Sequence, residues 1–201
     1  MNSEADEAAT ASAIKPKRKP LLWTGLGLTA VVASIGIWNG TVYFPVSNAL
    51  SGESGSSTIA YRRWLVSPDE IVFDIRSVAP SASMAEMDRR LFKAAEALKD
   101  RSYSKVVLAY RGTGKFLLEG GQFKTIGEER EFQNPIYTIR TLQEHVANMD
   151  GAPAFGTWTG GWLGVMGQQM NDHNEMHARW WVRDTSNLPE GTPIGETGST
   201  S

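Results

Sequence analysis

The stretch IVFDIRSVAPSASMAEMDRRLFKAAEALKDRSYSKVVLAY, residues 71–110, decides the fold class because it contains two different hydrophobic periods. At its start, Ile71, Phe73 and Ile75 recur at every second position, which places their side chains on one face of a half-buried strand. At its end, the run KVVLAY over 105–110 predicts a second strand. We therefore expect two strands joined by the segment between them.

The joining segment predicts an amphipathic helix. Ser83 and Glu86 form the Ser-x-x-Glu pattern of a capping box, in which two side chains satisfy free backbone N–H groups of the first turn. Apolar residues then follow at the spacing of one helix face: Met84, Met87, Leu91, Ala95 and Leu98. Strand, helix and strand in succession indicate a mixed α+β domain.

Similar patterns continue to residue 182. Residues 111–114 predict a hairpin loop before a third strand at 115–119, since glycine tolerates positive φ. The remaining expected elements are a helix over 120–132, a strand over 136–140, a short helix over 142–149 and a long helix over 160–182. The first six elements of this βαββαβα order match the split βαβ plan of ferredoxin-like folds.

Residues 21–38, LLWTGLGLTAVVASIGIW, form a run of eighteen positions without a charge. A helix of that length covers about 27 Å, close to the ~30 Å hydrocarbon thickness of a bilayer, so we expect a transmembrane helix. Directly before the run lie four basic residues, Lys15, Lys17, Arg18 and Lys19. The next basic residue is Arg62. The positive-inside rule therefore predicts a cytoplasmic N-terminus and a domain on the other side of the membrane.

A cleaved signal peptide is the alternative interpretation of the same run. The apolar region of a signal peptide spans about 7–15 residues and is followed by a small-x-small cleavage site. Here the run is longer and ends in Ile37, Trp38 and Asn39, which make a poor cleavage site. We therefore favour a retained helix.

A stripe of small residues, Gly25, Thr29 and Ala33, occupies every fourth position of this helix. Such stripes let transmembrane helices approach closely, so these residues are the candidates for helix pairing. The alternative is that small residues are common in membrane spans without any role in pairing.

The composition around the apolar run predicts unstructured segments. We expect a disordered cytoplasmic segment over 1–20, a flexible tether over 39–58 and a disordered tail over 184–201. The tether is expected mainly because 47–58 is rich in Ser and Gly. The folded domain is then expected over 59–183.

Composition also excludes several classes of function. The chain has no cysteine, which removes disulfides, thiolate nucleophiles and cysteine-ligated metal clusters. A formal net charge of −2 gives no general attraction to nucleic acid. The run GTGK over 112–115 ends like a phosphate-binding loop, but Ala109 and Phe116 replace the Gly and the Ser or Thr that the full motif requires. We therefore expect no nucleic-acid partner and no cofactor.

The run NDHNEMH over 171–177 is the candidate metal site, because His173 and His177 share one face of the expected helix. Glu175 points away from both histidines, unlike the Glu of the zinc-protease motif His-Glu-x-x-His. Any third ligand would come from elsewhere in the chain, for instance Glu144, His145 or Asp150. The competing interpretation, which we favour, is two partly buried histidines on the packing face of an amphipathic helix.

Trp158 and Trp162 lie in the glycine-rich run GTWTGGWLG over 156–164. Their large flat side chains would suit a surface that recognises a protein partner, a glycan or a lipid headgroup. The alternative, which we favour, is a tight turn into the last helix with both indoles buried, since an exposed Trp is costly unless it has a partner.

These features together predict a single-pass protein of a cell membrane, expected to be a bacterial inner membrane, that displays a periplasmic or extracellular binding, scaffolding or assembly domain without catalysis. Its expected partners are the bilayer, through 21–38, and a protein of the envelope or a second copy of the chain. The alternative is a metal-dependent hydrolase that uses His173 and His177.

Overall fold

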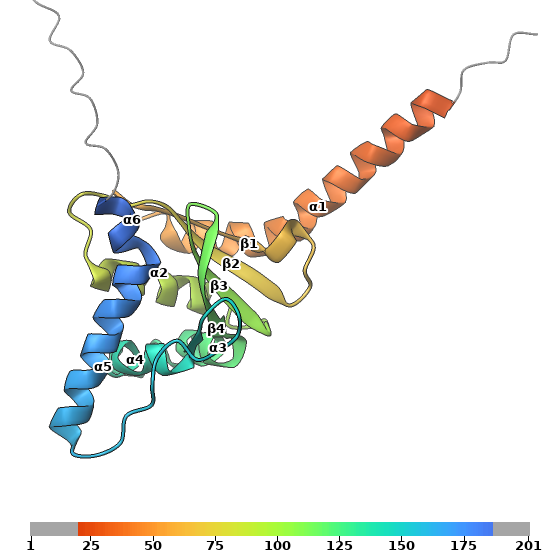
Figure 1. Ribbon diagram of the computed structural model, residues 1–201. Coiled ribbons are helices and arrows are strands. Elements are labelled where there is room, and N and C mark those ends of the chain that lie inside the picture. The colour runs from red at the N-terminus through yellow and green to blue at the C-terminus, as the bar shows by residue number, and fades with distance from the viewer. Residues whose placement is uncertain (1–19, 187–201) are drawn as a thin grey trace, which may run out of the picture. The chain divides into compact units, whose positions relative to one another are not determined.

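The computed structural model describes residues 20–186, with side chains from Thr29 onward (Figure 1). The segments expected to be disordered, 1–20 and 184–201, therefore lie largely outside the described residues. The chain divides into two compact units, Met1–Ser34 and Ile35–Ser201. Helix α1, Pro20–Leu50, begins in the first unit and ends in the second.

The apolar segment expected to be helical, 21–38, forms the first part of α1. Within the described side chains, Thr29–Leu50 is the one helical stretch long and apolar enough to cross a membrane, judged by length and composition. It lies near the N-terminus, where a signal sequence passes the same test.

The second part of α1 belongs to the folded domain. Val42, Val46 and Leu50, at intervals of four residues, are buried in the main hydrophobic core. Where a flexible tether was expected over 39–58, the structure has the end of α1, a short turn and the start of strand β1, Ser57–Arg62. A tether was expected because residues 47–58 are rich in Ser and Gly. The i, i+4 spacing of Val42, Val46 and Leu50 nevertheless places one side of the helix in the core.

Five strands form one sheet in chain order: β1, β2 (Glu70–Ser77), β3 (Lys105–Tyr110), β4 (Thr113–Glu119) and β5 (Val146–Ala147). Strands β2 and β3 are parallel, whereas the other neighbouring strands are antiparallel. A parallel pair needs a crossover connection, which contains helix α2, Met84–Ala97. The mixed α+β class and the first three expected strands are confirmed.

The turns and caps expected in this region are also present. Arg111 and Gly112 form a two-residue hairpin with φ values of 50° and 82°. Positive φ at both positions matches the twist of the flanking strands. At the start of α2, the Ser83 hydroxyl accepts a hydrogen bond from the Glu86 backbone N–H over 3.2 Å.

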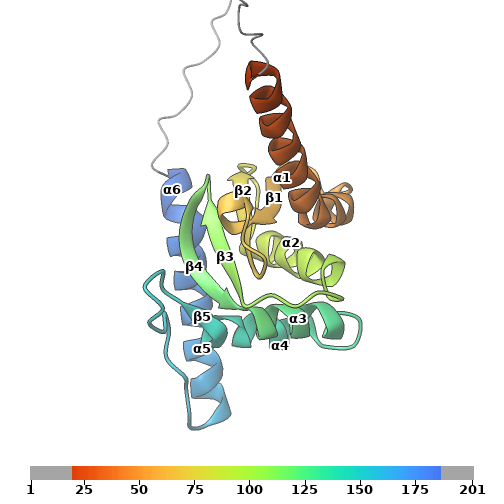
Figure 2. The ribbon, with the colours of Figure 1, turned by 90° about the vertical axis from the view of Figure 1, so that its right-hand side faces the viewer.

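The main core lies between one face of the sheet and helices that come from four parts of the chain (Figure 2). These are the end of α1, α2, α3 (Gly120–Glu129) and the π-helical turn η3 (Ala178–Val182), which continues helix α5 (Trp162–His177). The opposite face of the sheet carries a smaller apolar cluster of Val72, Val107, Ala109 and Leu117.

The ferredoxin-like plan is not confirmed. Residues 136–140, expected as a strand, lie in helix α4, Pro135–Thr141. Asn134 caps this helix by accepting a hydrogen bond from the Ile136 N–H over 3.0 Å. Pro135 disfavours helix for the residue before it, but it suits the first turn of a helix, where its missing N–H is not needed. The sheet instead contains β1 and the short β5, which follows the 3-10 helix η2, Leu142–His145.

Candidate functional site

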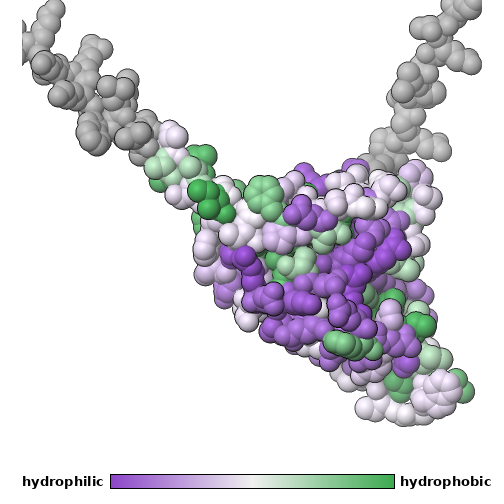
Figure 3. All heavy atoms as spheres, turned by 180° about the vertical axis from the view of Figure 1, so that it is seen from behind, coloured by the Kyte–Doolittle hydropathy of each residue, from purple (hydrophilic) through white to green (hydrophobic). Residues whose placement is uncertain are grey.

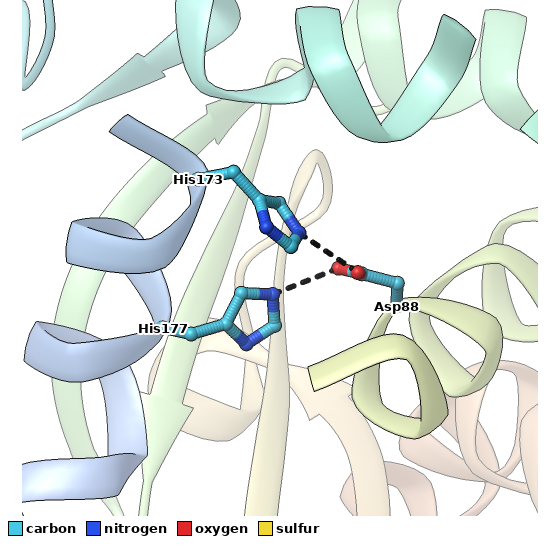
Figure 4. A group of neighbouring side chains, drawn as sticks. All are labelled: Asp88, His173 and His177. Carbon is cyan, nitrogen blue, oxygen red and sulfur yellow. Dashed lines mark hydrogen bonds and ion pairs between the residues drawn. The ribbon is translucent and has the colours of Figure 1, made fainter. Parts of the chain in front are cut away.

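The two histidines of the candidate metal site lie on the buried side of α5. His173 and His177 are one helical turn apart, and they are 4% and 0% exposed. Their ring centroids are 4.6 Å apart. Both rings face helix α2, which crosses the core opposite them (Figure 4).

Asp88 of α2 joins the two histidines. Its Oδ2 lies 2.9 Å from Nε2 of His173, and its Oδ1 lies 3.0 Å from Nε2 of His177 (Figure 4). Asp88 is 1% exposed, and each of its carboxylate oxygens contacts one imidazole. The centre therefore links two helices that are distant in the sequence.

Trp181 fixes which ring nitrogen of a neutral His177 carries the proton. Its indole N–H donates to Nδ1 of His177 over 2.9 Å in the buried core. Indole nitrogen is only a donor, so Nδ1 must offer a lone pair. The proton of a neutral His177 therefore lies on Nε2, from which it donates to Asp88.

The electrostatics of Asp88 follow from these contacts. Burial by itself raises the pKa of the Asp88 carboxyl, because it penalises the charged form. The hydrogen bonds from His173 and His177 and the charge interactions with both rings together outweigh burial and hold that pKa below its usual value. Asp88 is thus a buried carboxylate that accepts hydrogen bonds from two imidazoles. Among the described residues, Nδ1 of His173 has no hydrogen-bond partner.

The three residues resemble a metal site in composition but fit one poorly in hydrogen bonding. Their ligand atoms all lie within 4.8 Å of one another. A divalent metal between them would need a lone pair on Nε2 of His177, which moves the ring proton to Nδ1. The N–H at Nδ1 would then face the indole N–H of Trp181, so that two donors would point at each other. A structural link between α2 and α5 accounts for the hydrogen bonds of Asp88 and of both ring nitrogens of His177.

Asp88 was not predicted from the sequence. The other residues named as possible ligands lie elsewhere: His145 contacts Glu119, Glu144 accepts from Gln169, and Asp150 accepts from the Ala152 N–H. One signal was available, because Asp88 stands four residues after Met84 and three before Leu91. It therefore lies on the expected packing face of α2, where an acid is unusual.

The Trp-rich run is more exposed than expected. Trp162 is 69% exposed, and Trp158 is 39% exposed. The Trp158 indole N–H donates to Asp172 over 2.6 Å, which fixes its ring against α5. The interpretation that both indoles are buried is wrong, because the first turns of α5 extend beyond the helices that cover its later turns.

The small-residue stripe of α1 is described only in part. Gly25 lies in the part of the helix whose side chains are outside the description. Thr29 and Ala33 are exposed in this single chain. Helix pairing through these three residues stays a prediction.

Comparison of the chain with protein-family models, with curated proteins and with solved structures found no match.

Proposed function

We propose that this chain is a single-pass membrane protein whose α+β domain binds a protein partner through the first turns of α5, without catalysis. The observation that carries the proposal is the exposure of Trp162 and Leu163, at 69% and 65%, in a helix whose later turns are buried. Figure 3 shows a broad hydrophilic face, whereas the tip that contains these first turns is neutral to hydrophobic. Exposed apolar patches of this kind mark interaction surfaces.

Two glycines on the same turns support a closely packed partner. Gly164 and Gly167 are interior positions of α5, where glycine costs about 0.5–1 kcal/mol relative to alanine. A Cβ at either position would meet no atom within 4 Å outside the adjacent residues and backbone of its own helix. Nothing in the described chain therefore requires glycine there. A partner that packs against the bare backbone would require it.

A protein suits this surface better than a lipid headgroup. Helices that lie on membranes usually carry a polar face rich in Lys and Arg. Helix α5 contains no Lys or Arg, and it carries the acidic residues Asp172 and Glu175. An apolar tip next to acidic groups would be repelled by anionic lipids. It can still enter an apolar pocket of a protein.

The membrane anchor rests on the composition of 21–38 and on the basic residues before it. These features support a cytoplasmic N-terminus and a domain on the periplasmic side of a bacterial inner membrane. Alkaline extraction of membranes, with epitope tags at either end, tests this part. A full-length product that becomes soluble, or a carboxyl end in the cytosol, would contradict it.

Site-specific photo-crosslinking tests the binding surface. A photoreactive amino acid replaces Leu163 in the full-length chain, and a matched control replaces the exposed Arg101, which lies outside α5. We expect a discrete adduct at 163 that is absent at 101 and is lost when Gly164→Ala and Gly167→Ala are combined. An adduct of two copies of this chain would identify the partner as a second copy. The same adducts at both positions would contradict the proposal.

A metal-dependent hydrolase is the second candidate, because Asp88 is a third possible metal ligand beside His173 and His177. A catalytic zinc needs an open position for water or substrate in addition to three protein ligands. Asp88, His173 and His177 are buried. The contact with Trp181 places the lone pair of His177 on Nδ1, whereas a metal in this site would need it on Nε2. The hydrogen-bonded centre therefore favours the non-catalytic proposal.

A further inference from the structure

The segment 64–66 exposes three consecutive large apolar side chains. Trp64, Leu65 and Val66 are 78%, 50% and 58% exposed. They follow β1, and the first two belong to the 3-10 turn η1, Arg63–Leu65. An uninterrupted exposed apolar run of this kind is unfavourable in water unless it has a function.

The backbone of this segment is also strained. Trp64 and Leu65 have φ values of 55° and 63°, in the left-handed region that bulky side chains avoid. Such conformations persist only where surrounding contacts hold them in place, and they gather at functional sites. In this conformation both side chains are exposed rather than packed in the core.

The contacts that hold the segment come from α1. The amide nitrogen of Asn39 donates to the Leu65 carbonyl over 2.7 Å, and its amide oxygen accepts from the Arg62 backbone N–H over 2.9 Å. The guanidinium of Arg62 lies over the ring of Trp38, 4.0 Å from its centroid. Segment 64–66 is thus bonded to the residue after Trp38, the last residue of the apolar run 21–38.

We propose that segment 64–66 inserts into the headgroup region of the bilayer that holds α1, as a second membrane contact. This inference rests on the anchor of the proposed function. If the helix leaves the hydrocarbon at Trp38, a segment bonded to Asn39 lies within the headgroup region, which is roughly 5–7 Å thick on each side. Indole rings prefer that region, and leucine and valine can reach the acyl chains beneath it. The bilayer is therefore the occupant that is already adjacent.

Single-cysteine labelling tests the proposal with the full-length chain. Because the chain has no cysteine, one introduced thiol carries an environment-sensitive fluorophore without competition. The probe is placed at Leu65→Cys in vesicles of phosphatidylethanolamine and phosphatidylglycerol that contain a lipid-bound nitroxide quencher near the headgroup. Phe132→Cys is the matched control, since Phe132 is 85% exposed and lies outside η1 and α1. Val31→Cys reports on the anchor itself.

We expect quenching at position 65 to be several-fold stronger than at 132, with a blue-shifted emission. If position 31 is quenched and position 65 matches 132, the anchor stands and the second contact is refuted. If position 31 is not quenched, the anchor and this inference fail together. A disulfide dimer formed through Cys at 65 at high yield would assign the segment to a second copy instead and would also refute the inference.

Discussion

The indole N–H of Trp181 points at Nδ1 of His177 over 2.9 Å, one helical turn back in the chain. The two residues lie where α5 passes into the π-helical turn η3. This single contact orders the centre, because it places the His177 proton on Nε2 and directs it to Asp88. The same contact separates a hydrogen-bonded link from a metal site.

Replacing Trp181 with Phe should lower the free energy of unfolding by about 1–3 kcal/mol, because it removes a buried donor and leaves Nδ1 of His177 unpaired. Chemical denaturation measures the loss. Trp158→Phe deletes the same atoms at a half-exposed position and should change stability by less than about 0.5 kcal/mol. Nitrogen NMR of His177 should show an unprotonated Nδ1 in the natural chain. A protonated Nδ1 would contradict the assignment.

The purified full-length chain should contain no stoichiometric zinc, because the lone pair of His177 that a metal needs faces Trp181. Elemental analysis after growth in zinc-containing medium measures this. One zinc per chain that disappears in His173→Ala would overturn the non-catalytic proposal and restore the hydrolase.

The stability of the domain should depend on pH through Asp88. The pKa of this carboxyl is lower in the folded chain than its usual value of 3.8, so its contribution is complete above that pH and is lost as pH falls through the lowered pKa. Asp88→Asn should be less stable at neutral pH and should lose less stability in acid. Urea unfolding over a pH series compares it with the exposed control Asp100→Asn, which should keep the natural acid dependence.

Two glycines of α3 should respond oppositely to alanine. A Cβ on Gly127 would lie 2.3 Å from the Ala95 carbonyl oxygen of α2, so Gly127→Ala should force α2 and α3 apart and destabilise the domain by several kcal/mol. Gly121 has open space around it, and Gly121→Ala should stabilise the helix by up to about 1 kcal/mol. Thermal unfolding of both variants checks the sign of each change. Equal effects would mean that the two helices are not in close contact.

Residues of α1 should contribute to the stability of the domain. Val46 is fully buried, so Val46→Ala should cost about 1.5–3 kcal/mol. Phe44, on the same helix, is mostly exposed, and Phe44→Ala should change the free energy of unfolding by less than about 0.5 kcal/mol. Unfolding in mild detergent measures both. If Val46→Ala left the free energy of unfolding unchanged, the result would instead support the flexible tether expected over 39–58.

The elements with a clear local pattern could be predicted from the sequence. The alternation at Ile71, Phe73 and Ile75 and the cap at Ser83 depend on neighbouring residues alone, and both are present. Residues 136–140 resemble a strand in composition, but the cap formed by Asn134 and Pro135 makes them a helix. There the cap was the better indicator, and side-chain composition was misleading.

The centre could be predicted only in part, because its members are far apart in the chain. His173 and His177 are recognisable from their spacing. Their partner Asp88 becomes evident only when α2 and α5 pack together, although its place on the apolar face of α2 was a local sign. Trp181 has no sequence signature that distinguishes a donor to histidine from an ordinary core residue.

The continuation of α1 into the core has a consequence for proteolytic cleavage within this helix. A protease that cut between Val42 and Leu50 would separate Val42, or Val42 and Val46, from the rest of the hydrophobic interior. The liberated fragment would then be prone to unfolding and further degradation. With the proposed membrane anchor, such a cut would destroy the fold of the domain rather than release a soluble form of it.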